Sequence, residues 1–176
     1  MTEHEKKPIT LEIEKRWHLK NLADLPFDYR KFPKVSLIQG YIRGKPQKGK
    51  KCQTTRVRKE LRGKKAFFWL TTKTGKGTVR TEEEYLIEKK IFELLFCQVD
   101  CKLRKTRYFI PWNGAAIQLN IFHGKKLKDY YQIEVEFNTE EEAFAFVAPP
   151  WFGLEVTDDG RHGNRSLAKD GKPSMG

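Results

Sequence analysis

Charged and apolar residues alternate along most of this chain with a period of two, which is the side-chain periodicity of a β-strand. In the first such segment, Glu12, Glu14 and Arg16 share one face. The apolar Ile13 and Trp17 lie on the other face. Further segments carry the sets Arg56/Arg58, Trp69/Thr71/Lys73, Arg80/Glu82/Glu84, Lys105/Arg107, Gln118/Asn120 and Glu134/Glu136. A soluble sheet normally shows a mixed polar face, so paired acids and paired bases on successive strands indicate a charged interior surface.

This alternation, together with the content of β-branched and aromatic residues, predicts eight strands with mostly short connections. An antiparallel sheet of this size loses its exposed edges if it closes into a barrel. Closure would also bring the paired charges together on one inner face. The predicted strands cover residues 9–19, 35–43, 53–60, 65–73, 78–87, 103–110, 115–122 and 130–138.

Glycine-containing segments predict hairpin turns between several of these strands. Gly63-Lys64 and Gly75-Lys76-Gly77 are two of them, and Asn113-Gly114 is a strong two-residue hairpin signal. Antiparallel pairing of the flanking strands follows from such short connections.

Helical signals are fewer. The strongest, at residues 87–97, places apolar residues three and four apart; these are Ile87, Ile91, Leu94 and Leu95. Thr139 begins a capping box that predicts a short helix through Phe146. Shorter helical segments are predicted at residues 22–32 and 164–169. The predicted fold class is therefore α+β, an antiparallel barrel with a few flanking helices.

The charge of the chain is concentrated in one region. The 176 residues include 35 Lys or Arg and 23 Asp or Glu, which gives a net charge of +12. Between Arg43 and Arg80 there are 14 basic residues and one acid, Glu60. A block this basic attracts phosphates. The alternative for residues 45–51 and 62–65 is a pair of solvated hairpin loops.

Several function classes are disfavoured. The chain has no run of 18 apolar residues and a polar N-terminus, so we expect neither a membrane span nor a signal peptide. Its three cysteines have no paired CxxC spacing, and its four histidines lack the spacing of metal ligands. We therefore expect reduced thiols, a cytoplasmic location and no membrane partner.

The paired charges suit the chemistry of a triphosphate. Arg presents planar paired donors to phosphate oxygens and Lys a compact point charge. Carboxylates instead bind Mg²⁺ or Mn²⁺, which prefer hard oxygen ligands and bridge to phosphate. Phosphoryl transfer requires mainly positioning and charge neutralisation. An interior with both signs of charge therefore favours a phosphate ligand that binds together with divalent metal.

The same residues resemble the CYTH, or triphosphate tunnel metalloenzyme, superfamily, and its short bacterial-type members in particular. Glu12-Ile13-Glu14-Lys15-Arg16 is similar to the opening ExExK motif of that family. The resemblance covers roughly residues 9 to 170 in order. Its further motifs are Gln39-Gly40-Tyr41-Ile42, Arg56-Val57-Arg58, Leu70-Thr71-Thr72-Lys73, Arg80-Thr81-Glu82-Glu83-Glu84-Tyr85, Lys105-Thr106-Arg107-Tyr108, Phe122-His123-Gly124, Glu134-Val135-Glu136, Trp151 to Thr157 and Arg161 to Ala168.

The resemblance implies a closed eight-stranded antiparallel tunnel that binds triphosphate with Mg²⁺ or Mn²⁺. It implies catalytic roles for Arg16 and Lys73. The expected substrate-binding residues are Arg56, Arg58, Lys73, Arg80, Lys105 and Arg107, and the expected metal ligands are Glu12, Glu14, Glu82, Glu84, Glu134 and Glu136.

Two departures from the family pattern bear on activity. The last position of the opening motif is Arg16, and parity sends Lys15 to the opposite face. The strand before Phe122 usually carries acids in the family, but here it carries Gln118 and Asn120. An amide oxygen can contact a metal or a water, yet it brings no negative charge. These changes predict slower catalysis or altered metal binding.

The leading function is metal-dependent hydrolysis of a triphosphate, with inorganic triphosphate as the default substrate. One alternative is a catalytically impaired tunnel that binds a triphosphate, a nucleotide or another phosphorylated ligand; another is an adenylate cyclase of the same fold. Nucleic acid is an unlikely main partner, because the acids on other strands repel a phosphate backbone. We expect flexible ends at 1–8 and 171–176 around one domain at 9–170.

Overall fold

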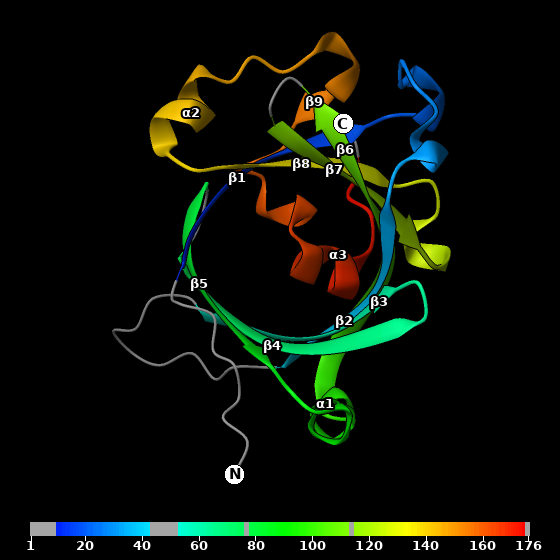
Figure 1. Ribbon diagram of the computed structural model, residues 1–176, viewed down its shortest axis with the longest axis vertical. Coiled ribbons are helices and arrows are strands. Elements are labelled where there is room, and N and C mark those ends of the chain that lie inside the picture. The colour runs from blue at the N-terminus through cyan, green and yellow to red at the C-terminus, as the bar shows by residue number, and fades with distance from the viewer. Residues whose placement is uncertain (1–9, 43–52, 76–77, 113–114, 175–176) are drawn as a thin grey trace.

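The chain folds into a closed antiparallel β-barrel (Figure 1). The computed structural model describes residues 10–42, 53–75, 78–112 and 115–174. Strand order is β5-β4-β3-β2-β6-β7-β8-β1, and pairing of β1 with β5 closes the ring, which confirms the predicted eight-stranded barrel. The strands are β1 (Thr10–Leu19), β2 (Lys34–Ile42), β3 (Gln53–Arg62), β4 (Lys65–Gly75), β5 (Val79–Leu86), β6 (Val99–Trp112), β7 (Ala115–His123) and β8 (Tyr131–Phe137).

The register of the ladder aligns charges of opposite sign on the inner face. Arg16 of β1 stands opposite Glu134 of β8. Lys73 of β4 stands opposite Glu82 of β5. Because side chains alternate between faces, a slip of one residue would turn these charges outward.

An extensive apolar cluster lies on the outer side of the barrel wall, where a small barrel usually faces solvent. Trp17 is 2% exposed and packs edge-on against Phe152 at 4.9 Å between ring centroids. The outward residues of β6, β7 and β8, such as Ile117 and Ile133, join the same cluster. The outer surface of β1 and β6–β8 is thus covered, while much of the inner surface is lined by charged groups.

Two strand assignments differ from the sequence prediction. β6 begins at Val99 instead of residue 103, because Cys101 and its neighbours pair with Tyr41 and Ile42 of β2 through an irregular register. The short strand β9 (Leu154–Glu155) was not predicted, since two residues carry no periodic signal. It follows Gly153, whose backbone has a φ of +86° and where any Cβ would lie 2.3 Å from the His18 carbonyl oxygen.

The helices are shorter than predicted. The predicted helix at 87–97 is α1 (Lys89–Phe96), which buries Phe92 against β3 and β4. Leu94, one of the apolar residues in the predicted spacing, is 66% exposed, whereas Phe92, Leu95 and Phe96 pack toward β3 and β4. The predicted helix at residues 22–32 consists of two 3₁₀ turns, since Pro26 prevents a continuous helix.

The second predicted helix is α2 (Glu140–Ala145), which Thr139 caps as expected. The predicted turn at Gly63-Lys64 joins β3 to β4, with Gly63 at a φ of +59°. Its neighbours Arg62, Lys64 and Lys65 are exposed. Gly75 ends β4, while the rest of its predicted turn, the Asn113-Gly114 hairpin and the basic loop at 45–51 lie outside the described residues.

The C-terminal segment enters the barrel. It includes a 3₁₀ turn, η5 (Gly160–His162), and α3 (Asn164–Asp170), which lies within the ring of strands (Figure 1). Leu167 of α3 packs with Leu103 and Phe122 of the inner wall. Beyond α3, the Lys172 N–H donates to the Lys126 carbonyl. The division into residues 1–8, 9–170 and 171–176 stays a prediction. Among the described residues, no helix has the length and apolar character needed to cross a membrane.

Candidate active site in the barrel

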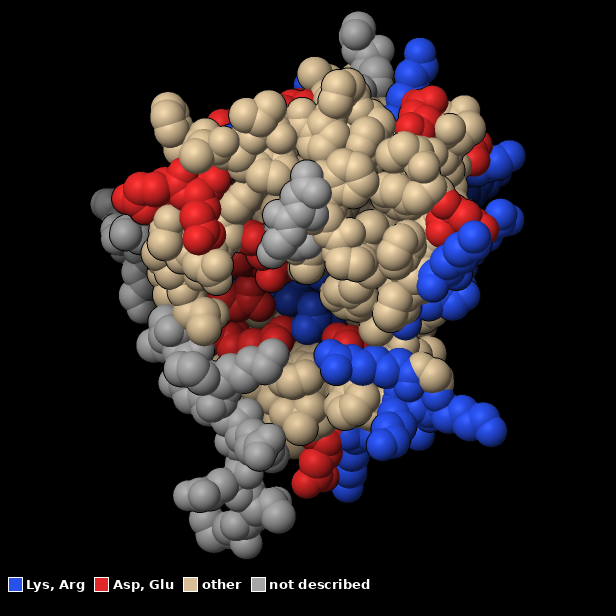
Figure 2. Space-filling model, turned by 45° about the horizontal axis from the view of Figure 1, so that its top comes forward, with Lys and Arg blue, Asp and Glu red and all other residues tan. Residues whose placement is uncertain are grey.

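The barrel encloses one large charged cavity of about 1010 Å³. Figure 2 shows its opening as a hollow with acidic side chains at one side and basic side chains deeper in. All thirteen residues predicted for the site line this cavity: Glu12, Glu14, Arg16, Arg56, Arg58, Lys73, Arg80, Glu82, Glu84, Lys105, Arg107, Glu134 and Glu136. The alternation of side chains along the strands therefore brings them together, although their individual roles stay predictions.

The cavity is nearly balanced in charge. Among the residues that the structure describes, nine Lys or Arg and eight Asp or Glu line it. The chain as a whole carries +12. Most of the positive excess therefore lies away from the cavity wall, and the wall itself is built from opposite charges in contact.

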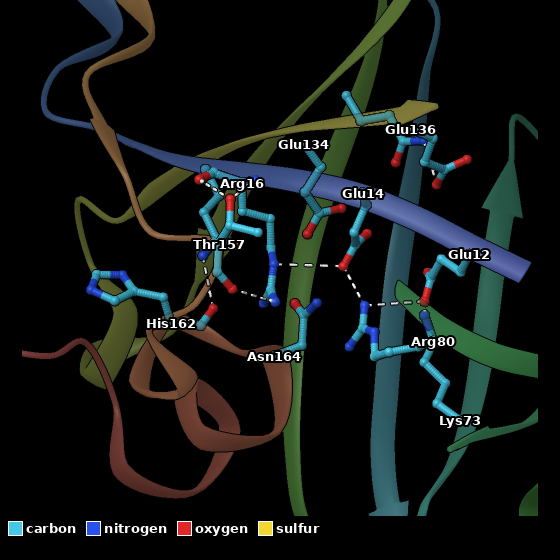
Figure 3. A network of polar contacts seen from close by, with 12 residues as sticks. Glu12, Glu14, Arg16, Lys73, Arg80, Glu134, Glu136, Thr157, His162 and Asn164 are labelled. Carbon is cyan, nitrogen blue, oxygen red and sulfur yellow. Dashed lines mark hydrogen bonds and ion pairs between the residues drawn. The ribbon is translucent and has the colours of Figure 1, made fainter. Parts of the chain in front are cut away.

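One group of contacts joins β1, β4 and β5. Lys73 binds Glu12, and its Nζ lies 2.8 Å from Glu82 Oε2. Arg80 lies between Glu14, which it contacts, and Glu12 Oε2 at 3.1 Å (Figure 3). Each cation thus bridges two acids: Lys73 joins Glu12 of β1 to Glu82 of β5, and Arg80 contacts two acids of β1.

The contacts continue along β3 without a break. Arg56 Nη2 lies 3.6 Å from a carboxylate oxygen of Glu82 and of Glu84. Arg58 donates to Glu84 Oε1 at 2.8 Å and approaches Glu60 at 3.8 Å. Glu60 in turn contacts Arg62 at the edge of the cavity. These side chains and those around Arg80 form one chain of alternating charges, from Arg62 to Glu14, which we call the ion-pair chain.

A second group surrounds Glu134, which is 2% exposed. Arg107 contacts one of its carboxylate oxygens, and Lys105 Nζ lies 3.7 Å from the other. Burial alone would raise the pKa of Glu134, but Lys105, Arg107 and Arg16 outweigh it and hold the pKa below its usual range. Burial also lowers the pKa of Lys105 well below that of an ordinary lysine, against the opposing effect of Glu134.

Three carboxylates converge as a possible metal site. Glu12, Glu14 and Glu136 each offer an oxygen, and these oxygens lie within 4.8 Å of one another. Hard oxygen donors of this kind fit Mg²⁺ or Mn²⁺. Within the described part of the chain Glu136 forms no ion pair, and loss of hydration, reinforced by Glu134 and Glu14, raises its pKa. A divalent cation would relieve that repulsion, so the donor set fits the metal.

The other three predicted metal ligands face basic side chains. Glu82 contacts Lys73 and Arg56, and Glu84 contacts Arg56 and Arg58. Burial raises the pKa of Glu82, but Lys73 and Arg56 reverse that effect and lower it. Glu134 is likewise engaged with cations. Of the six predicted acids, Glu12, Glu14 and Glu136 converge, although Glu12 and Glu14 also contact cations, while Glu82, Glu84 and Glu134 contact cations outside that cluster.

The amides Gln118 and Asn120 are buried on the inward face of β7, where Gln118 stands opposite Glu134 and Asn120 opposite Arg107. Asn120 Oδ1 accepts a hydrogen bond from Arg107 Nε at 2.9 Å. Gln118 Nε2 donates to Glu136 Oε1 at 2.9 Å. Both amides therefore orient functional side chains of β6 and β8.

Arg16 links the wall to the C-terminal segment. Its Nε lies 3.5 Å from Glu14, and its Nη2 donates to the Thr157 carbonyl at 3.4 Å (Figure 3). Lys15 points the other way, as parity predicts, and its Nζ lies 3.9 Å from Glu155 on β9. The guanidinium at position 16 thus spans two partners that a single ammonium group cannot hold in the same way.

Several cavity residues were missed from the sequence. Glu60 and Arg62 lie on the same face of β3 as Arg56 and Arg58. Extending the period-two pattern further along this strand would have identified them. Thr157 and Asn164 lie in the C-terminal segment, where no period-two pattern exists. Asn164 Oδ1 accepts a hydrogen bond from Lys105 at 3.2 Å, a contact that only the folded chain creates.

Known proteins share both the sequence and this fold. The chain is 36% identical over 137 residues to an inorganic triphosphatase of Nitrosomonas europaea, which covers 76% of this chain and 84% of the relative. The crystal structure of the inorganic triphosphatase NE1496 matches with a TM-score of 0.63 and 30% identity, over 92% of this chain and 97% of that chain. The putative adenylyl cyclase HpAC1 from Hippeastrum matches with a TM-score of 0.53 over 76% of this chain and 82% of that chain, but at 14% identity it shows the fold alone.

No protein-family model matches the chain. The relationship rests instead on the similarity to the Nitrosomonas protein over 76% of this chain and on the closed barrel with its charged interior. The same motifs that carry the sequence resemblance supply the side chains of the cavity. The chain belongs to the CYTH, or triphosphate tunnel metalloenzyme, superfamily.

Proposed function

We propose that this protein hydrolyses inorganic triphosphate inside the barrel in a reaction that depends on a divalent metal. The observation that carries the proposal is the meeting of six predicted phosphate-binding cations and a three-carboxylate cluster in one enclosed cavity. Similarity to an inorganic triphosphatase over three quarters of the chain supports the choice of substrate.

The cations would bind the phosphate groups from several strands at once. Arg56 and Arg58 project from β3, Lys73 from β4 and Arg80 from β5, while Lys105 and Arg107 project from β6. Guanidinium groups suit paired contacts to phosphate oxygens. Binding would replace the carboxylate partners of these cations by phosphate oxygens. The ion-pair chain already holds the cations in positions that face the cavity.

Glu12, Glu14 and Glu136 would hold Mg²⁺ or Mn²⁺. When bound, such an ion neutralises phosphate charge and polarises the oxygens around the reacting phosphorus. Glu82, Glu84 and Glu134 would instead orient Arg56, Arg58, Lys73, Lys105 and Arg107, because they are in contact with those cations.

Lys105 is the best-placed proton acceptor. It is 2% exposed, and burial lowers its pKa well below that of an ordinary lysine, which favours the neutral amine. A neutral amine can take a proton from an attacking water, as general-base catalysis requires. Lys73 and Arg16 would act by charge, since each holds its cationic head in the cavity next to Glu12 or Glu14.

Phosphate release tests the proposal. Protein freed of metal by chelation would be assayed with triphosphate, pyrophosphate and ATP, each with Mg²⁺ or Mn²⁺. We expect release from triphosphate only when metal is added, and a loss of about 10²-fold or more in Glu12→Gln. Glu93→Gln removes the same charge from the outer helix α1 and is expected to retain full activity. Metal-independent release would contradict the proposal.

A binder without turnover is the second candidate, because Gln118 and Asn120 stand where the family usually carries acids. In that case triphosphate would stabilise the protein but no phosphate would be released at any metal concentration. Conversion of ATP to a cyclic nucleotide and pyrophosphate in the same assay would instead indicate a cyclase. A cytoplasmic location stays a prediction.

A further inference from the structure

We propose that a buried hydrogen-bond network of Tyr130, Gln132 and His162 locks the C-terminal segment inside the barrel, and that His162 is thereby a positioning residue for Lys105. We call this network the latch. The inference rests on the proposed function for its kinetic consequence, but its structural part can be tested without turnover.

The latch joins the barrel to η5 through fully buried polar atoms. His162 Nδ1 lies 2.6 Å from the Tyr130 hydroxyl. Gln132 Nε2 donates to the Tyr130 hydroxyl at 3.1 Å and to the His162 carbonyl at 2.8 Å. The Tyr130 hydroxyl accepts from Gln132 and can donate its own proton to Nδ1. In that arrangement neutral His162 carries its proton on Nε2, on the side where Asp159 Oδ2 lies at 3.7 Å.

Such a network fixes one position of the segment in a way that apolar packing cannot. His162 is 2% exposed, Tyr130 1% and Gln132 0%. The surroundings include Leu167 and Phe122, so apolar side chains would fill this space at lower cost. Polar groups buried this deeply are stable only when their partners are in place. The segment can therefore dock in one register only.

The docked segment completes the wall around Lys105. Two residues beyond His162, Asn164 Oδ1 accepts from Lys105 Nζ at 3.2 Å. On the other side of the turn, the Thr157 carbonyl accepts from Arg16 (Figure 3). Lys105 thus lies between the barrel strands and a segment whose place the latch determines.

Loosening the latch would change the environment of Lys105 in a defined direction. Burial is the main cause of its lowered pKa. Glu134 and Glu14 face it and favour the charged amine, while Arg107 and Arg56 oppose it. Withdrawal of the segment admits water, so the pKa of Lys105 would rise. If neutral Lys105 accepts the proton, activity is lost below its pKa, so the acid limb of kcat/KM would move to higher pH.

The test compares two substitutions at His162. His162→Leu removes the acceptor, while His162→Asn keeps an acceptor near the position of Nδ1. Thr139→Ala removes the cap of α2 outside the barrel and serves as a control for general destabilisation. The pKa of Lys105 would be followed in each protein from the ¹³Cε NMR resonance that disappears in Lys105→Arg.

We expect the Lys105 pKa to rise by about one unit or more in His162→Leu, with kcat/KM at neutral pH reduced about tenfold per unit. His162→Asn should stay within about twofold of the parent protein, and Thr139→Ala should move neither quantity. If His162→Leu does not fold, Tyr130→Phe removes only the hydroxyl and should raise the same pKa. An unchanged Lys105 resonance in a folded latch variant would overturn the inference.

The two proposals fail separately. Absence of triphosphate hydrolysis in the parent protein would end the proposed function, yet the NMR titration would still decide whether the latch controls Lys105. Full activity together with an unmoved Lys105 titration in His162→Leu would end the latch alone.

Discussion

The side-chain amide of Gln118 on β7 donates to Glu136 Oε1 on β8 at 2.9 Å. The amide orients this carboxylate without adding charge to it. Glu136 therefore joins Glu12 and Glu14 as the third acid of the cluster, with a neutral neighbour in the place where a fourth acid could stand. The affinity of this cluster for metal therefore depends on the neutral amide at position 118.

Gln118→Glu should strengthen metal binding. A fourth carboxylate beside Glu136 adds negative charge next to the cluster, and its repulsion is relieved when a divalent cation binds. We expect the half-saturating concentration of Mn²⁺ to fall by about tenfold, equivalent to about 1.4 kcal/mol. Isothermal titration calorimetry with the metal alone measures this directly. Gln98→Glu, on the exposed side beyond α1, makes the same charge change and should leave the affinity unchanged.

Arg16→Lys should lower stability even though it restores the residue typical of the family. The guanidinium contacts both Glu14 and the Thr157 carbonyl, and a lysine ammonium cannot reproduce that geometry. Loss of one buried charged hydrogen bond predicts a decrease of about 1–3 kcal/mol in the free energy of unfolding. Urea denaturation measures it. Lys15→Arg, on the outer face, should stay within about 0.5 kcal/mol of the parent protein.

Glu134 and Glu136 should shift the pH dependence of stability in opposite ways. The pKa of Glu134 is lower in the folded state, so its contribution is present above the ordinary pKa of 4.5 and is lost as pH falls through the folded value. Glu134→Gln should flatten the acid limb of the stability curve. It should also cost about 3–5 kcal/mol at neutral pH, because two buried cations lose their partner.

The pKa of Glu136 is raised, so the folded state holds its proton more tightly and stability falls as pH rises above about 4.5 through the folded value. Glu136→Gln should therefore increase stability at neutral pH in the absence of metal. Thermal denaturation between pH 3 and 8 compares the two variants. Parallel curves for both would show that the carboxylates do not differ as the structure indicates.

Triphosphate should stabilise the protein more than a simple anion does. At a hundredfold excess over Kd, ligand binding adds about 2.7 kcal/mol to the free energy of unfolding. For a chain of this length the melting temperature would rise by roughly 5–10 °C. Sulfate at matched ionic strength is the control and should produce a much smaller shift. Arg56→Ala and Arg58→Ala should each reduce the shift obtained with triphosphate.

Much of the fold and of the inner wall can be predicted from the sequence, because successive side chains on a strand alternate between its two faces. Once Glu12 and Glu14 are assigned to one face, the same rule places Arg56, Lys105 and Glu134 with them. Parity does not specify which charges touch. The separation of Glu136 from the cation-bound Glu134 depends on strand register and on the side chains of neighbouring strands, which no local pattern encodes.

The irregular segments were harder to predict. β9 is too short to show a period, and the contact of Asn164 with Lys105 depends on how the C-terminal segment enters the barrel. The spacing in α1 includes Leu94, which is exposed, because apolar residues occur on more than one side of that helix. Tertiary packing against β3 and β4 selects one of them.

The ion-pair chain from Arg62 to Glu14 has a consequence for selectivity. Each cation in it is already matched by an acid, so an anion that enters alone must separate charges and leave carboxylates uncompensated. A polyphosphate accompanied by a divalent ion meets no such obstacle, because the ion takes over the carboxylates as the phosphates take over the cations. We therefore expect the wall to select by exchange of partners, and to bind chloride, sulfate and orthophosphate only weakly.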